Sequence, residues 1–167
     1  MLVKRCQAEF SRSANTTAYS ADQVVSNGSL ITFTFKNADG LAPVGSGLGI
    51  SGSYMIKSAK LTSNSSGTTN ASFDLYLYSS GITAVTTDNF PFNQQYSTKH
   101  VRIGKTSFTL TNPSANSNSK EDVNVDLNFL FKASATTIYG ILVAGAAYTP
   151  ASGESFYVEL ELLSINE

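Results

Sequence analysis

The feature of this sequence that most constrains its fold is an alternation of apolar and other side chains with a period of two residues. The pattern is clearest in residues 123–131 and recurs in residues 30–35, 73–78 and 156–162. Successive side chains of a β-strand point to opposite faces, so each run predicts a half-buried strand. No segment longer than about ten residues has the 3.6-residue period of an amphipathic helix.

Four weaker runs predict further strands, at residues 19–25, 54–61, 101–110 and 137–144. The last run is apolar on both faces, which predicts a strand covered on both sides. Turn-forming dipeptides that end in glycine separate the apolar runs; they are Asn27-Gly28, Asp39-Gly40, Ser66-Gly67, Ser80-Gly81 and Ser152-Gly153.

Together these runs predict an all-β domain of about eight antiparallel strands, which forms a sandwich or a barrel. Two longer loops, residues 79–98 and 111–121, make the connections uneven and favour crossovers over a plain meander. We therefore predict a β-sandwich of the jelly-roll type. An immunoglobulin-like sandwich is the second choice, because the chain lacks the usual Trp and cysteine pair of that fold.

The length of 167 residues suits one domain. We predict an N-terminal arm at residues 1–14, which carry Lys4, Arg5 and Arg12 with few strand signals, and a single domain at residues 15–167. The arm has no apolar core segment and is not expected to be a secretory signal. Our hypothesis is that it reaches a neighbouring subunit.

Small polar residues replace charge in this chain: 24 Ser, 17 Thr and 13 Asn stand beside 11 basic and 12 acidic residues. A net charge of −1 argues against nucleic-acid binding. No apolar stretch approaches the roughly 20 residues of a membrane span. Cys6, the single cysteine, excludes an intramolecular disulfide and a thiolate zinc cage, and is expected to be a buried or idle thiol.

The residues for acid–base or nucleophilic catalysis are sparse. His100 is the only histidine, so a Ser-His-Asp triad would need it, with Asp74, Asp88, Asp122 or Asp126 to orient it. The Gly-x-Ser-x-Gly nucleophile elbow is missing from the sequence. We expect a surface histidine, no catalytic residues and no enzyme.

Two carboxylates, Glu159 and Glu161, fall on one face of a predicted strand, as an acid and base acting on a sugar would. Because the opposite face is the apolar one, we expect both to face solvent or a partner. Oxygen ligands for calcium are offered by Asp88, Asn89, Asp122 and Asp126. No loop has the dense spacing of a calcium site, so we predict no bound metal.

Residues 47–52 match the pattern G-x-G-x-x-G. In a dinucleotide-binding unit these glycines follow a strand and open a helix, whereas here they lead into the predicted strand at residues 54–61. The match is therefore attributed to a flexible connection, and no cofactor is expected.

Aromatic residues gather in two places. Tyr76 and Tyr78 share one face of a strand, and Phe90, Phe92 and Tyr96 crowd one loop. Such residues form the core in most proteins, and they also anchor protein interfaces or serve as platforms for sugars and bases. The core is the first expectation for this set.

Several stretches together resemble a known group of proteins; they are residues 17–25, 56–63, 73–78 followed by 87–90, and 139–162. In this order they resemble capsid decoration, or cement, proteins of tailed bacteriophages with jelly-roll folds. The resemblance extends from about Ala18 to Ile165. The chain departs from the pattern at residues 20–22, where Ala-Gly-Asp is more usual, and in the loop at residues 111–121.

The resemblance implies a non-catalytic structural protein of the virion. It would bind the outside of the major capsid protein lattice and stabilise the head, as a homotrimer on the capsid exterior, after synthesis in the cytoplasm of the host bacterium. It implies no nucleic-acid or membrane partner. The alternatives are another virion component, such as a head fibre, tail or baseplate protein, or a carbohydrate-binding β-sandwich module.

Overall fold

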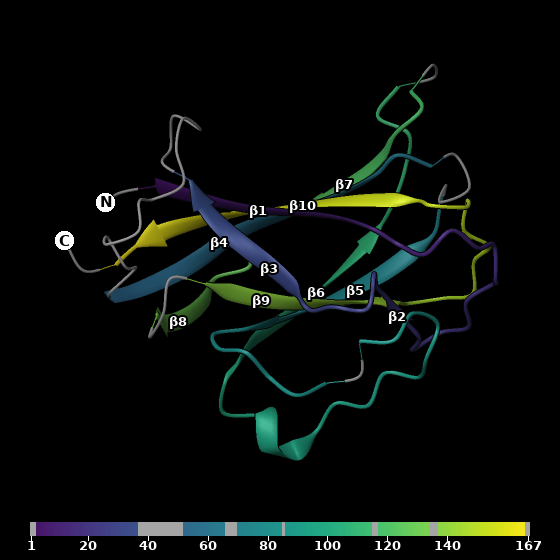
Figure 1. Ribbon diagram of the computed structural model, residues 1–167. Helices are drawn as coiled ribbons and strands as arrows, with labels where there is room; N and C mark the ends of the chain where they lie inside the picture. Colours follow the sequence, from purple (N-terminus) through teal and green to yellow (C-terminus); the bar gives the residue numbers. More distant parts are fainter. Residues whose placement is uncertain are drawn as a thin grey trace.

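A computed structural model describes residues 3–36, 52–65, 70–84, 86–114, 117–133 and 137–165. Two antiparallel sheets pack face to face in it as a β-sandwich (Figure 1), which confirms the predicted class. The described residues contain no α-helix and a single 3-10 turn, η2 (Tyr96–Thr98). The strands are β1 (Val3–Ser11), β2 (Val24–Val25), β3 (Ile31–Lys36), β4 (Gly52–Ser63), β5 (Ser72–Tyr78), β6 (Arg102–Thr109), β7 (Lys120–Asn124), β8 (Phe129–Ala133), β9 (Ile138–Ala144) and β10 (Ser155–Ser164).

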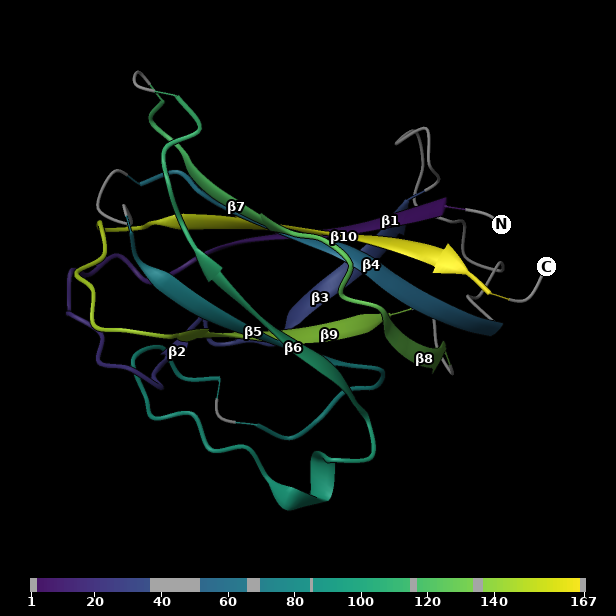
Figure 2. The same ribbon diagram turned by 180° about the vertical axis from the view of Figure 1, so that it is seen from behind.

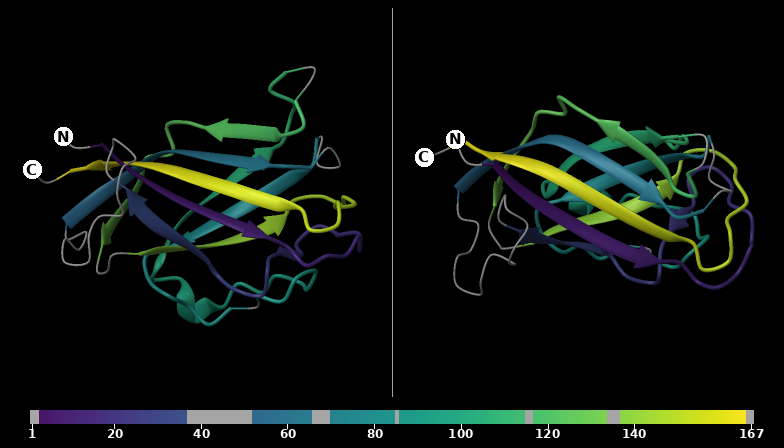
Figure 3. Two further views of the ribbon diagram at one scale, coloured as in Figure 1. Left: turned by 45° about the horizontal axis from the view of Figure 1, so that its top comes forward. Right: turned by 90° about the horizontal axis from the view of Figure 1, so that it is seen from above.

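One continuous order of strands, β6-β5-β9-β3-β1-β10-β4-β7, runs through both sheets. The first sheet holds β1, β10, β4, β7 and β8, and the second holds β6, β5, β9 and β2 (Figure 3). Strand β3 belongs to both, because Ile31–Phe33 pairs with β9 whereas Thr34–Lys36 pairs with β1. The sandwich is therefore joined along one side by a shared strand.

The core lies between the two sheets and follows the predicted alternation. On β10 the apolar set Phe156, Val158, Leu160 and Leu162 is fully buried. On β5 the set Phe73, Leu75 and Leu77 is fully buried as well. Phe156 and Phe73 meet edge to face across the sandwich, with their ring centroids 5.3 Å apart. Both strand predictions are confirmed.

The long loop between β5 and β6 forms a third layer on the outer side of the second sheet (Figure 2). Apolar side chains of this loop, among them Ile82 and Phe92, pack on a small cluster that includes Tyr78, Ile141 and Val143. This cover explains why β9 is buried on both faces, as its composition predicted.

The clearest predicted strand, residues 123–131, is two strands in the structure, so the prediction of one continuous strand is wrong. Between β7 and β8, Asp126 and Asn128 have φ values of 55° and 53°, a left-handed conformation that Asp and Asn tolerate better than most residues. Val125, predicted to face the core, is 67% exposed. The break lies beside a bulge in β4, where Lys57 Nζ bonds Asp126 Oδ1 at 3.2 Å and Asn128 Oδ1 at 2.9 Å.

The prediction of an N-terminal arm is also wrong for the nine residues of β1. This strand lies inside the first sheet, with β10 on one edge and β3 on the other. Cys6 and Phe10 point from it into the core, and burial raises the pKa of the Cys6 thiol. The sequence signal was weak because only these two core-facing positions are fully apolar and buried, while Lys4 and Arg12 interrupt the pattern.

Residues 19–25 are strand only in part. Val24 and Val25 form β2, whereas Tyr19 and Gln23 make isolated bridges to Tyr148 and Pro91. The described strands therefore exceed the predicted eight, because short segments and a divided strand add to them. The jelly-roll connectivity stays a prediction.

Candidate functional site

The residues considered for a catalytic triad do not meet in the structure. His100 is exposed and lines a hollow of about 240 Å³ outside the second sheet, together with Ser97, Thr98, Gln95 and neighbouring small residues. No carboxylate lines this hollow among the described residues.

Each of the four Asp residues considered as an orienting group for His100 binds other groups. Asp74 accepts hydrogen bonds from Lys105 Nζ at 2.6 Å and Ser107 Oγ at 2.5 Å. Asp122 accepts the main-chain N–H of Thr109 at 2.7 Å. Asp126 pairs with Lys57, and Asp88 belongs to the buried cluster described below. Within the described ranges, no three His, Cys, Asp or Glu side chains come together as a possible metal site.

Most of the glycine-rich pattern at residues 47–52 lies outside the described residues, and Gly52 begins β4. The aromatic residues divide between core and surface. Tyr78 is buried, and the ring of Tyr76 lies 4.6 Å from that of Phe92. Phe90 and Tyr96 are exposed. The loop aromatics therefore do not form one shared platform.

The outer face of the first sheet is built by β1, β10, β4 and β7, which lie side by side (Figure 3, right). Its centre is polar: Glu159 and Glu161 project from β10 and Glu9 from β1, as predicted for the two carboxylates of β10. The Tyr157 hydroxyl lies 3.1 Å from Glu159 Oε2, and burial together with this contact raises the pKa of Tyr157 to about 12. Lys60 Nζ pairs with Glu121 Oε2 at 2.6 Å.

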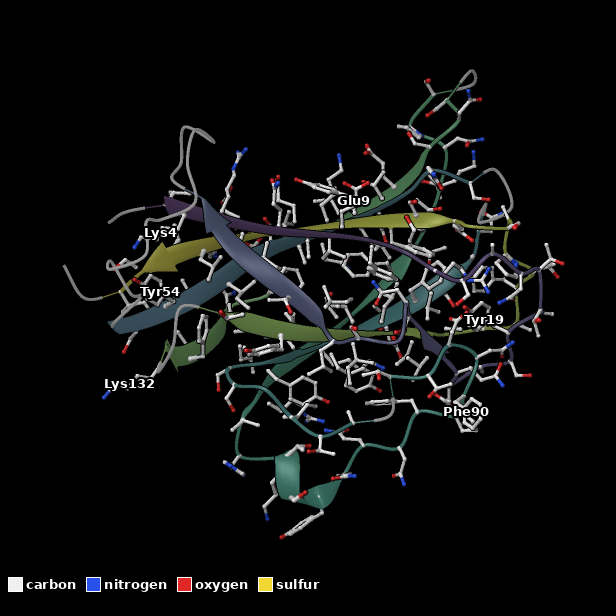
Figure 4. The ribbon with its side chains drawn as sticks, in the orientation of Figure 1. Lys4, Glu9, Tyr19, Tyr54, Phe90 and Lys132 are labelled. Atoms are coloured by element: carbon white, nitrogen blue, oxygen red, sulfur yellow. The ribbon has the colours of Figure 1, made fainter. Side chains whose placement is uncertain are left out.

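An apolar row crosses the same face near the end where β1 begins. The strand registers place Val3 beside Leu163, Leu163 beside Met55, and Met55 beside Leu130. Leu130 is 65% exposed and the other three are half-buried. We call these four residues the apolar row. Lys4, Tyr54 and Lys132, labelled in Figure 4, mark the same end of the sandwich.

At the opposite end of the sandwich, where Tyr19 is labelled in Figure 4, a buried polar cluster surrounds Arg12. The Arg12 side chain is fully buried. Its Nε donates to Tyr19 Oη at 2.8 Å, and its Nη2 donates to Asp88 Oδ2 at 3.2 Å and Asn15 Oδ1 at 3.0 Å. Its Nη1 donates to the main-chain oxygens of Asn15 and Ala151 at 2.8 and 3.2 Å. Every N–H of the guanidinium therefore has a partner.

Asp88 completes this cluster from the long loop. Its Oδ1 accepts hydrogen bonds from the Tyr19 hydroxyl and from the main-chain N–H of Ser26. Sequence reasoning missed the cluster, because Asp88 and Ala151 are far from Arg12 in the chain. Arg12, directly after β1, gave no local signal of its burial. The hydrogen bonds of the cluster join four loops, which indicates a structural role.

Two buried polar atoms beside this cluster have no hydrogen-bond partner among the described residues: Tyr148 Oη and Glu154 Oε2. The other carboxyl oxygen of Glu154 accepts from Ser63 Oγ at 2.6 Å. Burial raises the pKa of Glu154, against the lowering effects of the Ser63 hydrogen bond and the Arg12 charge. The fold therefore favours the protonated carboxyl.

The substitution Glu154→Gln is expected to reduce the pH dependence of stability. The pKa of Glu154 in the folded protein is raised above its ordinary value of 4.5. The protonated carboxyl therefore adds to the free energy of unfolding in full below pH 4.5, and this contribution is lost as the pH rises through the raised pKa. The neutral amide keeps its contribution at every pH. We expect the variant to be more stable at neutral pH by about 1 kcal/mol.

Urea denaturation of both proteins across the acidic and neutral range measures this effect. Glu121→Gln, on the outer face, is the matched control and is expected to change stability little. A difference between wild type and Glu154→Gln that does not change with pH would contradict the assignment.

No protein-family model and no curated protein matches this chain. None of the described residues belongs to a helix of the length and apolar character that crossing a membrane requires. The geometry defines the class as a β-sandwich.

Proposed function

We propose that this chain is a structural protein of a bacteriophage virion, a capsid decoration protein that binds the outside of the major capsid protein lattice and stabilises the head. The observation that carries the proposal is the outer face of the first sheet, which joins a polar centre to an exposed apolar row. This composition suits a protein interface, in which apolar contacts are surrounded by polar, hydrated groups. The resemblance of residues 18–165 to decoration proteins supports the same role.

The rest of the proposal follows the resemblance. The protein would adopt the jelly-roll form of the sandwich, assemble as a homotrimer and reside on the capsid exterior. Repetition over a symmetric lattice multiplies weak individual contacts into stable binding. Sedimentation of the purified protein tests the trimer.

The number of copies per purified phage particle, measured by quantitative mass spectrometry, tests the function. Copies in simple ratio to the major capsid protein are the expected result. A small number typical of a tail, baseplate or fibre would assign the protein to another virion component. Complete absence from the particle would overturn the structural role and favour the carbohydrate-binding alternative.

Leu130→Asp is expected to weaken binding to capsids that lack the protein by about tenfold or more, because it places a charge in the apolar row. Folding should be unaffected, since Leu130 is already 65% exposed. Tyr96→Asp is the matched control: Tyr96 is 78% exposed on the loop layer outside the second sheet. Co-sedimentation measures both. Loss of binding in the Tyr96 variant alone would assign docking to the loop layer instead.

A further inference from the structure

Strands β1 and β3 separate along their length and leave part of β1 without a neighbour. They pair from Arg5 opposite Lys36 to Gln7 opposite Thr34, after which β3 turns to the second sheet and pairs with β9. Figure 1 shows the two strands diverging at this point. The last residues of β1 then have β10 on one edge and, within the described chain, no strand on the other.

The hydrogen-bond direction along β1 is fixed by its neighbours. Arg12 N–H donates to Glu154 O at 3.0 Å, on the β10 side. Main-chain groups alternate sides along an antiparallel strand, so those of even-numbered residues of β1 point to β10. Those of Glu9 and Ser11 point to the other edge, where β3 has already left.

The facing edge of β3 follows the same rule. Gly145 N–H donates to Ser72 O on the β5 side, so odd-numbered residues at this part of β9 bond β5 and even-numbered ones bond the opposite neighbour. Ile31 and Phe33, opposite Gly140 and Ile138, therefore turn their main-chain groups to β9. Those of Thr32 point back towards β1.

Between these two edges lies a gap of about 190 Å³. This volume holds roughly six water molecules or an equal volume of polypeptide. Phe10 and Ile31 of the core line it, and Glu9 is the one ionisable residue among those that line it; the full lining is Ala8, Glu9, Phe10, Asn27, Ser29, Leu30, Ile31 and Thr32. We call it the β1–β3 gap.

We propose that the β1–β3 gap accepts an extended segment of a partner protein, which inserts as a strand between β1 and β3. Main-chain donors and acceptors face the gap from both edges, and only a β-strand offers matching groups on both of its own edges. A side chain of the inserted strand that points towards the core contacts Phe10 and Ile31, so the partner has an apolar residue at that position. A side chain of the inserted strand that points outward lies beside the exposed Glu9 carboxylate. Glu9 has no ion-pair partner in the described part of the chain, so the partner has a basic residue at that position.

A titration of the full-length, ¹⁵N-labelled protein with the peptide acetyl-Thr-Lys-Val-Lys-Thr-amide tests this proposal by NMR. Its valine alternates with lysines as the gap requires. We expect the amide signals of Glu9, Ser11 and Thr32 to shift on addition of the peptide. Unchanged signals at these three positions with millimolar peptide would overturn the proposal.

Two control peptides separate strand insertion from other binding. One carries an N-methyl group on the valine and the other on the preceding lysine, so each removes a main-chain donor from a different edge. Because insertion uses both edges, either methylation is expected to weaken binding about tenfold. If only one of the two N-methylations weakened binding, or neither did, insertion between the two strands would be overturned.

Matched protein variants complete the test. Ala8→Leu fills the gap from its lining and is expected to abolish the shifts, while amide signals elsewhere keep their native positions. Glu9→Gln is expected to weaken binding of the lysine peptide. It should also remove most of the difference in affinity between this peptide and one with glutamates in place of the lysines. Equal binding by wild type and Ala8→Leu would contradict the location. These measurements involve no phage particle, so their outcome is independent of the proposed function.

Discussion

Removal of residues 1–11 is expected to unfold the protein. The deletion removes β1, which pairs with β10 over its whole length and with β3 at Arg5–Gln7 and which supplies Cys6 and Phe10 to the core. Truncation of one buried phenylalanine costs about 3–5 kcal/mol. The whole stability of a typical domain is about 5–15 kcal/mol, so the loss of a central strand exceeds what the fold can tolerate.

Circular dichroism and urea denaturation of the truncated chain measure this effect. The expected result is the loss of the cooperative transition, with partial recovery when a synthetic peptide of residues 1–13 is added. Arg5→Thr is the control within the same strand: its side chain is exposed on the outer face, so the variant should unfold like wild type. A truncated protein with a native spectrum and a cooperative transition would show that β1 is dispensable, as an arm would be.

Arg12→Ala is expected to lower the free energy of unfolding by about 3–5 kcal/mol, the usual effect of removing one partner of a buried ion pair. The substitution leaves the Asp88 carboxylate, with 11% of its side chain exposed, without its cation. It also removes the donors that satisfy Tyr19, Asn15 and the main-chain oxygen of Ala151. The three loops that hold Asn15, Asp88 and Ala151 lose their common contact.

Urea denaturation measures the change in stability. Lys57→Ala removes the exposed pair with Asp126, whose carboxylate side chain is 78% exposed, and should cost less than about 1 kcal/mol. Arg12→Lys tests geometry against charge: lysine keeps the charge but lacks the planar fork, so we expect most of the loss to remain. A cost for Arg12→Ala no larger than that for Lys57→Ala would show that the buried cluster contributes little.

The sequence predicted the strands in which apolar residues alternate regularly. The prediction failed where the alternation continues but the strand does not. In β5 and over residues 156–162 of β10 every core-facing position is apolar, and the pattern alone identified strand and face. Residues 123–131 alternate equally well, yet the chain leaves the strand at Asp126 and Asn128. Their side chains bond Lys57 of β4, a residue 69 and 71 positions away. No local window contains that information.

The candidate sites show the same division. The outward direction of Glu159 and Glu161 was predictable, because it depends only on the period of one strand. The apolar row was not, because Val3, Leu163, Met55 and Leu130 come from four strands and become neighbours only through pairing registers. The Arg12 cluster was hidden for the same reason, since its partners lie on loops that meet at one end of the sandwich.

The sequence by itself determined that this protein is a β-sandwich, since period-two patterning and the shortage of helical periodicity are local properties that each strand carries alone. Tertiary structure decided that β1 is central, that a long loop adds a third layer, and that β3 leaves β1 to open a gap. The physical reason is that strand pairing is non-local. An edge, a face and a gap are properties of which strands lie side by side, and that depends on how the two sheets together bury their common core.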